Sequence, residues 1–248
     1  MAGINAALKV QNKEPFILRR DESYIGVLID DLTTKGTEEP YRMFTSRVEY
    51  RLVVREDNAD RRLSQYGHQF GLITDEEYRK VEEKYRLIEK EITHLKTTRV
   101  APGTALDQEL NKKNSAPLKQ STLLSDLLKR PEVDYAMIAP YDGDLKKYSR
   151  NIIEQVEYEI KYEGFIERQA RDIARFRHIE NIKLSPEINY DEIPSLSKEI
   201  RQKLNQLRPM NLGQAHRISG VTPAAISILM IWLKKRQQEK RTESDISG

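Results

Sequence analysis

The sequence contains no cysteine among its 248 residues. That absence excludes a disulfide framework, a cysteine-based zinc site and a thiol nucleophile within this chain, and it fits a reducing compartment. No charged-then-apolar signal segment opens the chain. The long apolar run from Ala224 to Leu233 is about half of the ~20 residues that cross a bilayer. We therefore expect a soluble, cytoplasmic protein without a membrane segment.

Excess charge of one sign is also lacking. Lysine and arginine total 42 against 39 acids, which leaves a formal net charge of only +3. Any affinity for nucleic acid must therefore come from local clustering of cations. The histidines have no metal-ligand spacing and no glycine-rich phosphate loop occurs. No catalytic residue and no metal site are predicted within this chain.

Hydrophobic periodicity predicts a mainly α-helical chain. Thr74 and Glu77 form a capping-box pattern that opens a helix. Apolar residues then follow in steps of three and four, as in a helix that packs along one stripe: Tyr78, Val81, Tyr85, Ile88, Ile92 and Leu95. The polar stretch 97–121 predicts a long connection with one short helix. A brief helix over 125–130, stopped by Pro131, follows it.

A third block begins near Leu145, and its helix, with Ile152, Val156 and Ile160 on one face, is interrupted at Gly164 and resumes through Phe176. Three helices over 196–207, 212–218 and from Pro223 onward are expected to close the chain. Thr222 is placed as the N-cap of the last one. Because 224–233 is apolar almost all round, this last helix is expected to be buried.

Two segments near the start read as extended strands, 24–32 and 51–54, since both are rich in aliphatic residues. Adjacent acids on a strand point to opposite faces. Asp30 and Asp31 are accordingly predicted to make turn or salt-bridge contacts, not to form a site.

The stretch from Pro40 to Leu63 fits no amphipathic period. It interleaves Arg42, Arg47 and Arg51 with the rings of Tyr41 and Phe44. Rings and guanidinium groups together serve base stacking and phosphate contact. Two interpretations are open: a solvated charged face, or a surface that positions an anionic ligand.

Other cations form two further candidate nucleic-acid surfaces. Arg168, Arg171 and Arg175 share a helical stripe with Lys161, which is either a solvated face with internal ion pairs or a phosphate-tracking stripe. Arg217, Lys234 and Lys235 flank the turn 218–224, whose amides point ahead of a helix N-terminus. That turn is either ordinary helix capping or a phosphate contact.

The stretch 40–63 closely resembles part of a known family. With Tyr24–Leu32 before it, Lys161–Gly164 after it and Arg217–Ser227 near the end, it is similar to the C-terminal portion of the MnmG/GidA tRNA-modification enzymes. The resemblance implies a helical C-terminal region of several short bundles, preceded by a small α/β tail of an upstream flavin-binding domain. The implied division is 1–70 for that tail, 71–145 for a first helical subdomain and 146–248 for a second. The small, apolar start at Met1–Leu8 is expected to be a fragment boundary or an early break in a longer reading frame.

Members of this family use FAD and NADH, with the GTPase MnmE, to modify C5 of the wobble uridine of tRNA, and the full-length enzyme is expected to be a homodimer. The resemblance implies that both cofactors are bound mostly upstream, and none is expected for this chain alone. Arg42, Arg47 and Arg51 would lie where the uridine is delivered, or Arg47 and Glu49 would tie the helical region to the flavin domain. Pro223, Ile228 and Trp232 are the implied contacts to MnmE. The alternative function is a free-standing helical nucleic-acid-binding or assembly module without catalysis.

Overall fold

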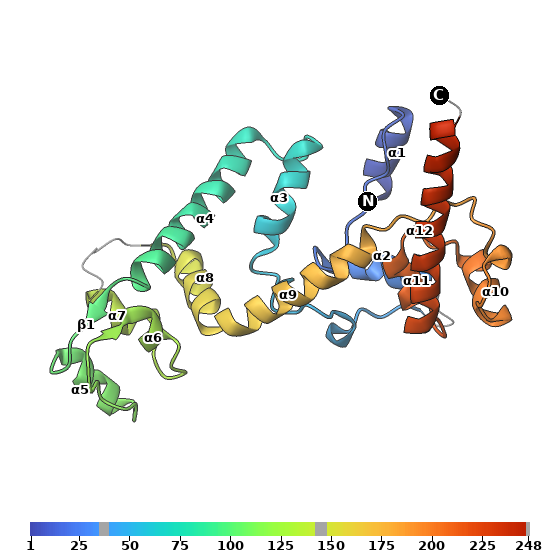
Figure 1. Cartoon of the computed structure of the whole chain (residues 1–248). Coiled ribbons are helices and arrows are strands. Elements are labelled where there is room, and N and C mark those ends of the chain that lie inside the picture. The colour runs from blue at the N-terminus through green and yellow to red at the C-terminus, as the bar shows by residue number, and fades with distance from the viewer. Residues whose placement is uncertain (35–39, 142–147, 247–248) are drawn as a thin grey trace. The chain divides into compact units, whose positions relative to one another are not determined.

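The structure, a computed structural model, describes residues 1–34, 40–141 and 148–246, and these are mainly α-helical (Figure 1). The helical class expected from the sequence is confirmed. Two compact units are formed, the first from residues 1–16 and 50–170 and the second from 17–49 and 171–248. Within the described ranges no helix is both long and apolar enough to cross a bilayer. The three-part division of the chain at residues 70 and 145 stays a prediction.

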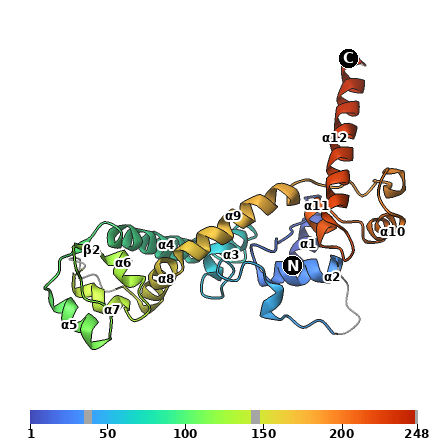
Figure 2. The same ribbon diagram turned by 60° about the horizontal axis from the view of Figure 1, so that its bottom comes forward.

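The first unit contains most of the helices in the N-terminal two thirds of the chain. Its elements are α1 (Ala2–Val10), α3 (Ala59–Gln69), α4 (Asp75–Leu95), β1 (Arg99–Val100), α5 (Ala105–Lys112), β2 (Thr122–Leu123), α6 (Leu124–Leu128), α7 (Tyr135–Ile138), η2 (Ala139–Tyr141), α8 (Arg150–Lys161) and the first part of α9 (Glu163–Glu180). Helices α4 and α8 pack against each other, as both views of the ribbon show (Figures 1 and 2).

Helix α4 begins where the capping box predicts. The Glu77 amide donates to Thr74 Oγ1 at 3.2 Å, and the Thr74 amide donates to the Glu77 carboxylate at 2.7 Å. Each side chain thus satisfies an amide that the first helical turn leaves unpaired. The expected helix start is confirmed.

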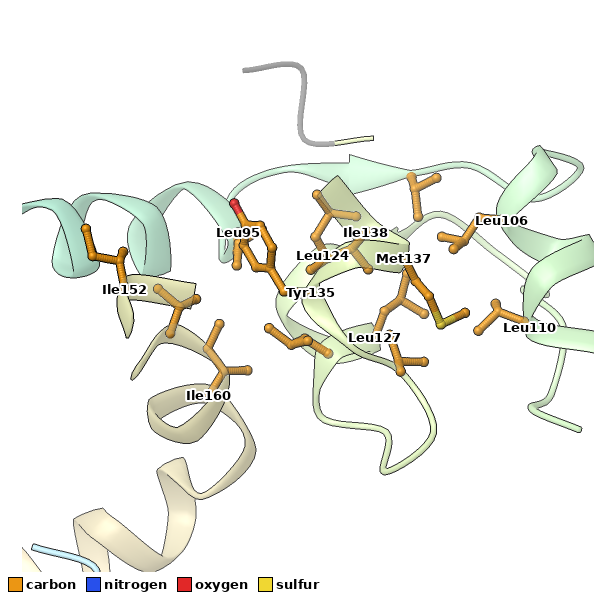
Figure 3. Packing of buried hydrophobic residues seen from close by; sticks show 14 of the residues in the cluster. Leu95, Leu106, Leu110, Leu124, Leu127, Tyr135, Met137, Ile138, Ile152 and Ile160 are labelled. Atoms are coloured by element: carbon orange, nitrogen blue, oxygen red, sulfur yellow. The ribbon is translucent and has the colours of Figure 1, made fainter. Parts of the chain in front are cut away.

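The predicted apolar stripe of α4 faces the core of this unit. Tyr85, Ile88 and Leu95 are buried, and Val81 and Ile92 pack against the same cluster. The other side of this core is formed by the short elements that follow β1. Figure 3 shows side chains of this core converging from α4, α5, α6, α7 and α8: Leu95, Leu106, Leu110, Leu124, Leu127, Tyr135, Met137, Ile138, Ile152 and Ile160.

The connection after α4 contains more structure than predicted. The expected short helix is α5, but β1 and β2 also pair antiparallel, with Arg99 opposite Leu123 and Val100 opposite Thr122. Strands of two residues are too short to show a hydrophobic period, so no pattern in the sequence predicts this pair. The pairing brings α5 and α6 to the core, and α6 itself lies close to its predicted position.

The second unit comprises the remaining elements. They are α2 (Tyr24–Thr34), η1 (Thr45–Arg47), the second part of α9, η3 (Tyr190–Glu192), α10 (Lys198–Leu207), α11 (Leu212–Arg217) and α12 (Pro223–Ile246). The apolar faces of α10, α11 and α12 meet in a core of their own, separate from that of Figure 3. The three C-terminal helices therefore occur where the sequence places them.

The strand predicted over 24–32 is wrong, because this segment is helix α2. Ser23 Oγ accepts the Gly26 amide at 2.9 Å, which caps the first turn. A Cβ at Gly26 would lie 2.3 Å from the carbonyl oxygen of Arg19, so only glycine fits this close approach. The second predicted strand, 51–54, is also wrong: it forms turns in which the amides of Val53 and Val54 both donate to the Tyr50 carbonyl.

Helix α12 is less buried than its composition suggests. Thr222 Oγ1 accepts the Ala225 amide at 3.3 Å, so the predicted N-cap is confirmed. Ala225, Ile226 and Leu229 are buried, whereas Ile231 is 69% exposed. The expectation of a helix buried all round is therefore wrong, and α12 leaves an apolar face uncovered.

Candidate nucleic-acid and partner surfaces

An arginine-bearing turn is held against α8 and α9 in the first unit. The amides of Leu52 and Val53 donate to Gln169 Oε1 at 3.2 and 3.3 Å. Arg55 donates to Gln155 at 3.1 Å and to Glu159 at 3.3 Å. Arg51 is exposed on this turn and forms no hydrogen bond or ion pair with the residues that the structure describes. Its guanidinium group is free to contact an anion.

The basic stripe predicted on one helix is divided between two. Lys161 ends α8, and α9 begins at Glu163, so the break lies at Tyr162 and Gly164 is inside the next helix. Arg168 is exposed and makes no polar contact within the described part of the chain.

The next two cations of the stripe belong to the second unit. Arg171 and Arg175 are both exposed, and Arg175 pairs loosely with Asp172 at 3.8 Å. A pair at that distance on an exposed face contributes little stability. Both predicted contacts to nucleic acid stay predictions.

Arg20 is the centre of a buried ion cluster in the second unit. Its Nη1 lies 2.8 Å from Asp31 and 3.1 Å from Asp30, and its Nη2 lies 2.8 Å from Glu49. Burial alone would lower the pKa of the Arg20 guanidinium, but hydrogen bonds and attraction from Glu49 and Asp31 raise it well above its ordinary value. The Arg20 guanidinium therefore stays charged at any physiological pH.

The predicted site residue Arg47 belongs to the edge of this cluster. Its Nη1 lies 3.4 Å from Asp31, and its guanidinium stacks over the Tyr41 ring at 4.7 Å. The Tyr41 hydroxyl donates to Asp31 at 2.9 Å, and burial followed by this bond raises the pKa of Tyr41. Arg42 beside it is exposed and unpaired among the described residues. Of the two arginines, Arg42 has the freer charge.

Arg217 ties α11 to two other helices of the same unit. It donates to both carboxylate oxygens of Asp30 at 2.7 and 2.9 Å and to Glu180 at 2.7 Å. Burial would lower the pKa of Arg217, and the bonds to Asp30 and Glu180 raise it. Asp30 and Asp31 thus make the predicted salt-bridge contacts. They lie on a helix and not on the predicted strand, and both carboxylates reach Arg20. A nucleic-acid contact by Arg217 stays a prediction, and it would have to compete with these carboxylates.

The turn between α11 and α12 is held by side chains of the same unit. The Lys203 ammonium donates to the Ser219 carbonyl at 2.8 Å, and the Val221 amide donates to the Ile218 carbonyl at 3.0 Å. Gly220 has a φ of +87°, a conformation that other residues rarely adopt. These contacts and the Thr222 cap show that ordinary capping occurs at this turn, and a phosphate contact there stays a prediction.

The uncovered face of α12 includes two of the predicted partner residues. A groove of about 530 Å³ lies between α12 and the loop before α10, and Ile193, Pro194, Ile228, Ile231 and Trp232 line its apolar part. Arg236 stacks over the Trp232 ring at 5.0 Å. Pro223, the third predicted residue, is exposed at the first turn of α12, and Lys234 and Lys235 are exposed near the groove.

Sequence reasoning missed three residues that form ion pairs in the second unit. Arg20, Asp21 and Arg177 were not singled out, although Arg177 donates to buried Asp21 at 2.9 Å. Burial would raise the pKa of Asp21, but the bonds from Arg19 and Arg177 hold it below its usual range. Arg177 and Asp21 are 156 residues apart, so no local sequence pattern links them.

The chain matches two models of one family. Residues 75–170 match "tRNA modifying enzyme MnmG/GidA C-terminal helical domain", and residues 172–247 match "tRNA modifying enzyme MnmG/GidA C-terminal helical bundle". Their boundary lies within α9, close to the boundary between the two compact units. Two successive helical modules of this type define a C-terminal region of a tRNA-modifying enzyme.

Curated relatives agree with the family models. The chain is 50% identical over 97% of its length to "tRNA uridine 5-carboxymethylaminomethyl modification enzyme MnmG" of Clostridium kluyveri and 52% identical over 97% to the enzyme of the same name from Alkaliphilus oremlandii. A crystal structure of Aquifex aeolicus GidA superposes over 94% of the chain with a TM-score of 0.80 and 43% identity. The chain belongs to the MnmG/GidA family. It spans about 38% of the curated relatives' length and 36% of the Aquifex chain.

Proposed function

We propose that this chain is the tRNA- and partner-binding part of a flavin-dependent enzyme that modifies C5 of the wobble uridine, forming carboxymethylaminomethyl- or aminomethyl-uridine with the GTPase MnmE. The observation that carries the proposal is the similarity along 97% of the chain to relatives named for this modification. The exposed, unpaired Arg42, Arg51 and Arg168 supply charges that phosphates require. The cytoplasm, where tRNA is modified, is the proposed location.

The flavin and nicotinamide of the whole enzyme do not fit the residues described here. A dinucleotide site needs a parallel strand, a glycine-rich turn and a helix N-terminus that receives the pyrophosphate. The paired strands of the described ranges are the two-residue antiparallel β1 and β2. A cavity of about 340 Å³ beside α2 is lined by Asp30, Arg20 and Arg217, and both arginines already pair with Asp30. No step through either cofactor is derived for this chain.

Binding of tRNA to the chain is expected to weaken steeply with salt. If about four arginines and lysines contact phosphates, affinity falls by about two orders of magnitude between about 50 and about 200 mM salt. Filter binding of a bulk tRNA over this range measures the slope. Arg42→Ala and Arg168→Ala are each expected to reduce the slope by about one.

A matched control is Arg150→Ala, since Arg150 is 91% exposed but belongs to no predicted surface. It should leave the salt slope unchanged. No detectable binding, or binding that does not respond to salt, would contradict the proposed tRNA surface. A slope reduced by Arg150→Ala as much as by Arg42→Ala would show diffuse attraction without a defined interface.

The groove on α12 is the proposed docking surface for MnmE, with Pro223, Ile228 and Trp232 as contacts. Ile231 lies 69% exposed in its lining, so Ile231→Ser changes the surface without opening the core. We expect this variant to weaken binding of purified MnmE by about tenfold or more, because an apolar anchor at the centre of an interface carries much of its free energy. Titration calorimetry measures the change.

The control for the docking surface is Leu72→Ser, which removes a similarly exposed side chain in the first unit. Equal affinity of wild type and Ile231→Ser for MnmE would place the partner elsewhere. The homodimer of the whole enzyme and the assignment of residues 1–70 to the flavin domain are parts of the same proposal.

A further inference from the structure

Three aromatic rings are exposed where α8 meets α9. Tyr158, Tyr162 and Phe165 are 36%, 42% and 59% exposed, and they follow one another at intervals of four and three residues. Tyr158 lies on α8, Phe165 on α9, and Tyr162 at the junction between the two helices. Folding normally removes large rings from water. The core in Figure 3 takes Ile152 and Ile160 from α8 and leaves these rings outside.

The rings border the arginine turn described above. Arg55 stacks over Tyr158 at 5.7 Å while it is anchored to α8. Gln169, one helical turn beyond Phe165, receives the amides of Leu52 and Val53. Arg51 therefore belongs to a turn fixed against α8 and α9, and Arg168 follows Phe165 by three residues on α9. The three rings and the two arginines thus belong to the same short segments of the first unit: residues 51–55 and the junction of α8 and α9.

Three acids on the same helices are paired with cations. Glu159 pairs with Arg55 at 3.3 Å, and Glu154 pairs with Arg150 at 2.7 Å. Glu163, between Tyr162 and Phe165, is held by Lys96 and Lys129, whose hydrogen bonds keep the pKa of its carboxyl below the usual range. Arg51 and Arg168 are exposed and make no ion pair within the described residues, so both keep a positive charge for a ligand.

We infer that Tyr158, Tyr162 and Phe165 form a stacking platform for unpaired nucleotides of an RNA, with Arg51 and Arg168 contacting the flanking phosphates. The inference rests on the proposed function for its class of ligand. Every base has a face that stacks on an aromatic ring, and a cationic border tracks the backbone. Between residues 150 and 170 the exposed large apolar side chains are these three rings, so the surface lacks the exposed aliphatic groups of a typical protein-docking face.

The test uses the whole 248-residue chain and two short probes. One probe is an unstructured, uridine-rich RNA of about seven nucleotides, within the usual site size for single strands. The other is an oligonucleotide of equal length that carries abasic sites in place of bases. Fluorescence anisotropy measures both affinities for wild type and for Tyr162→Leu/Phe165→Leu, which keeps apolar bulk but removes the rings.

We expect the double variant to lose about tenfold or more in affinity for the RNA, as stacking on two rings is worth at least that factor. Its affinity for the abasic probe and its salt slope should match wild type, because no phosphate contact is removed. Arg51→Ala/Arg168→Ala should instead weaken both probes and lower the slope. An unchanged melting temperature of the leucine variant excludes misfolding as the cause.

Equal RNA affinity of wild type and the leucine variant would overturn the platform, as would equal losses on both probes. Wild-type binding that does not distinguish the RNA from the abasic probe would also overturn it. The proposed function is tested separately with folded tRNA. Ring-dependent binding of the short RNA without binding of tRNA would support the platform and count against the proposed function alone.

Discussion

Replacing Arg20 by methionine is expected to lower the free energy of unfolding of the second unit by about 3–5 kcal/mol at neutral pH. Arg20 is 4% exposed, and Asp31, its partner at 2.8 Å, has a side chain that is 1% exposed. Methionine has similar length and no charge, so the variant leaves a buried carboxylate without its main cation. Asp30 is less affected because Arg217 still holds it. Urea denaturation followed by circular dichroism measures the loss.

The pH dependence of this loss identifies its cause. In the variant, Asp31 stays buried and keeps Arg47 and the Tyr41 hydroxyl but loses its nearest cation, so its carboxyl takes up a proton more readily in the folded variant than in the folded wild type. The penalty of Arg20→Met should therefore shrink as the pH falls and grow as it rises through that titration. Arg150→Met removes an exposed pair and should cost less than about 1 kcal/mol at every pH. A penalty for Arg20→Met that equals this control would show that the cluster contributes no stability.

The position of Arg20 explains why the sequence did not reveal the cluster. Its partner Glu49 is 29 residues away, and Arg217 meets Asp30 across 187 residues. Local patterns report on neighbours within a few residues, whereas these pairs depend on the tertiary fold. Asp30 and Asp31 were expected to make salt bridges, which is confirmed. That both would reach one arginine could not follow from an extended segment.

The sequence was most informative where a local rule is strong. The Thr74–Glu77 capping box and the α4 stripe are set by contacts within four residues, and both are confirmed. The strand predicted for segment 24–32 was wrong because its isoleucine, valine and leucine content favours strands. In the structure, Ser23 as an N-cap and the close backbone approach at Gly26 favour a helix. Ser23 could have been recognised in the sequence as a helix N-cap, whereas the backbone contact at Gly26 could not.

The candidate surfaces show the same division. The sequence pattern predicted Arg42, Arg51 and Arg168 as nucleic-acid contacts. In the structure each of them is exposed and without a partner in the described residues. The pattern also predicted Arg217, whose donors are taken by Asp30 and Glu180. A basic residue and its acidic partner can be far apart in sequence, so exposure cannot be read from composition. Whether any of these residues contacts tRNA stays a prediction.

The second large effect is expected in the core of the first unit, where Leu127→Ala should cost about 2–5 kcal/mol. Leu127 is fully buried on α6, whose five residues are too few to form a stable helix alone. Figure 3 shows it among Leu124, Met137 and Leu110, so α6 is held by side-chain packing from its neighbours.

The cavity left by this substitution should persist, because α4, α7 and α8 all pack on α6 and hold their positions around it. Leu72→Ala, at a side chain that is 64% exposed, is the matched control and should cost less than about 1 kcal/mol. Hydrogen exchange adds a local measurement: amides of α6 and α7 should exchange faster in Leu127→Ala, since opening these short helices no longer removes as much apolar area from contact. Unchanged exchange there, with a loss below about 1 kcal/mol, would mean that α6 is held mainly by its backbone and not by this core.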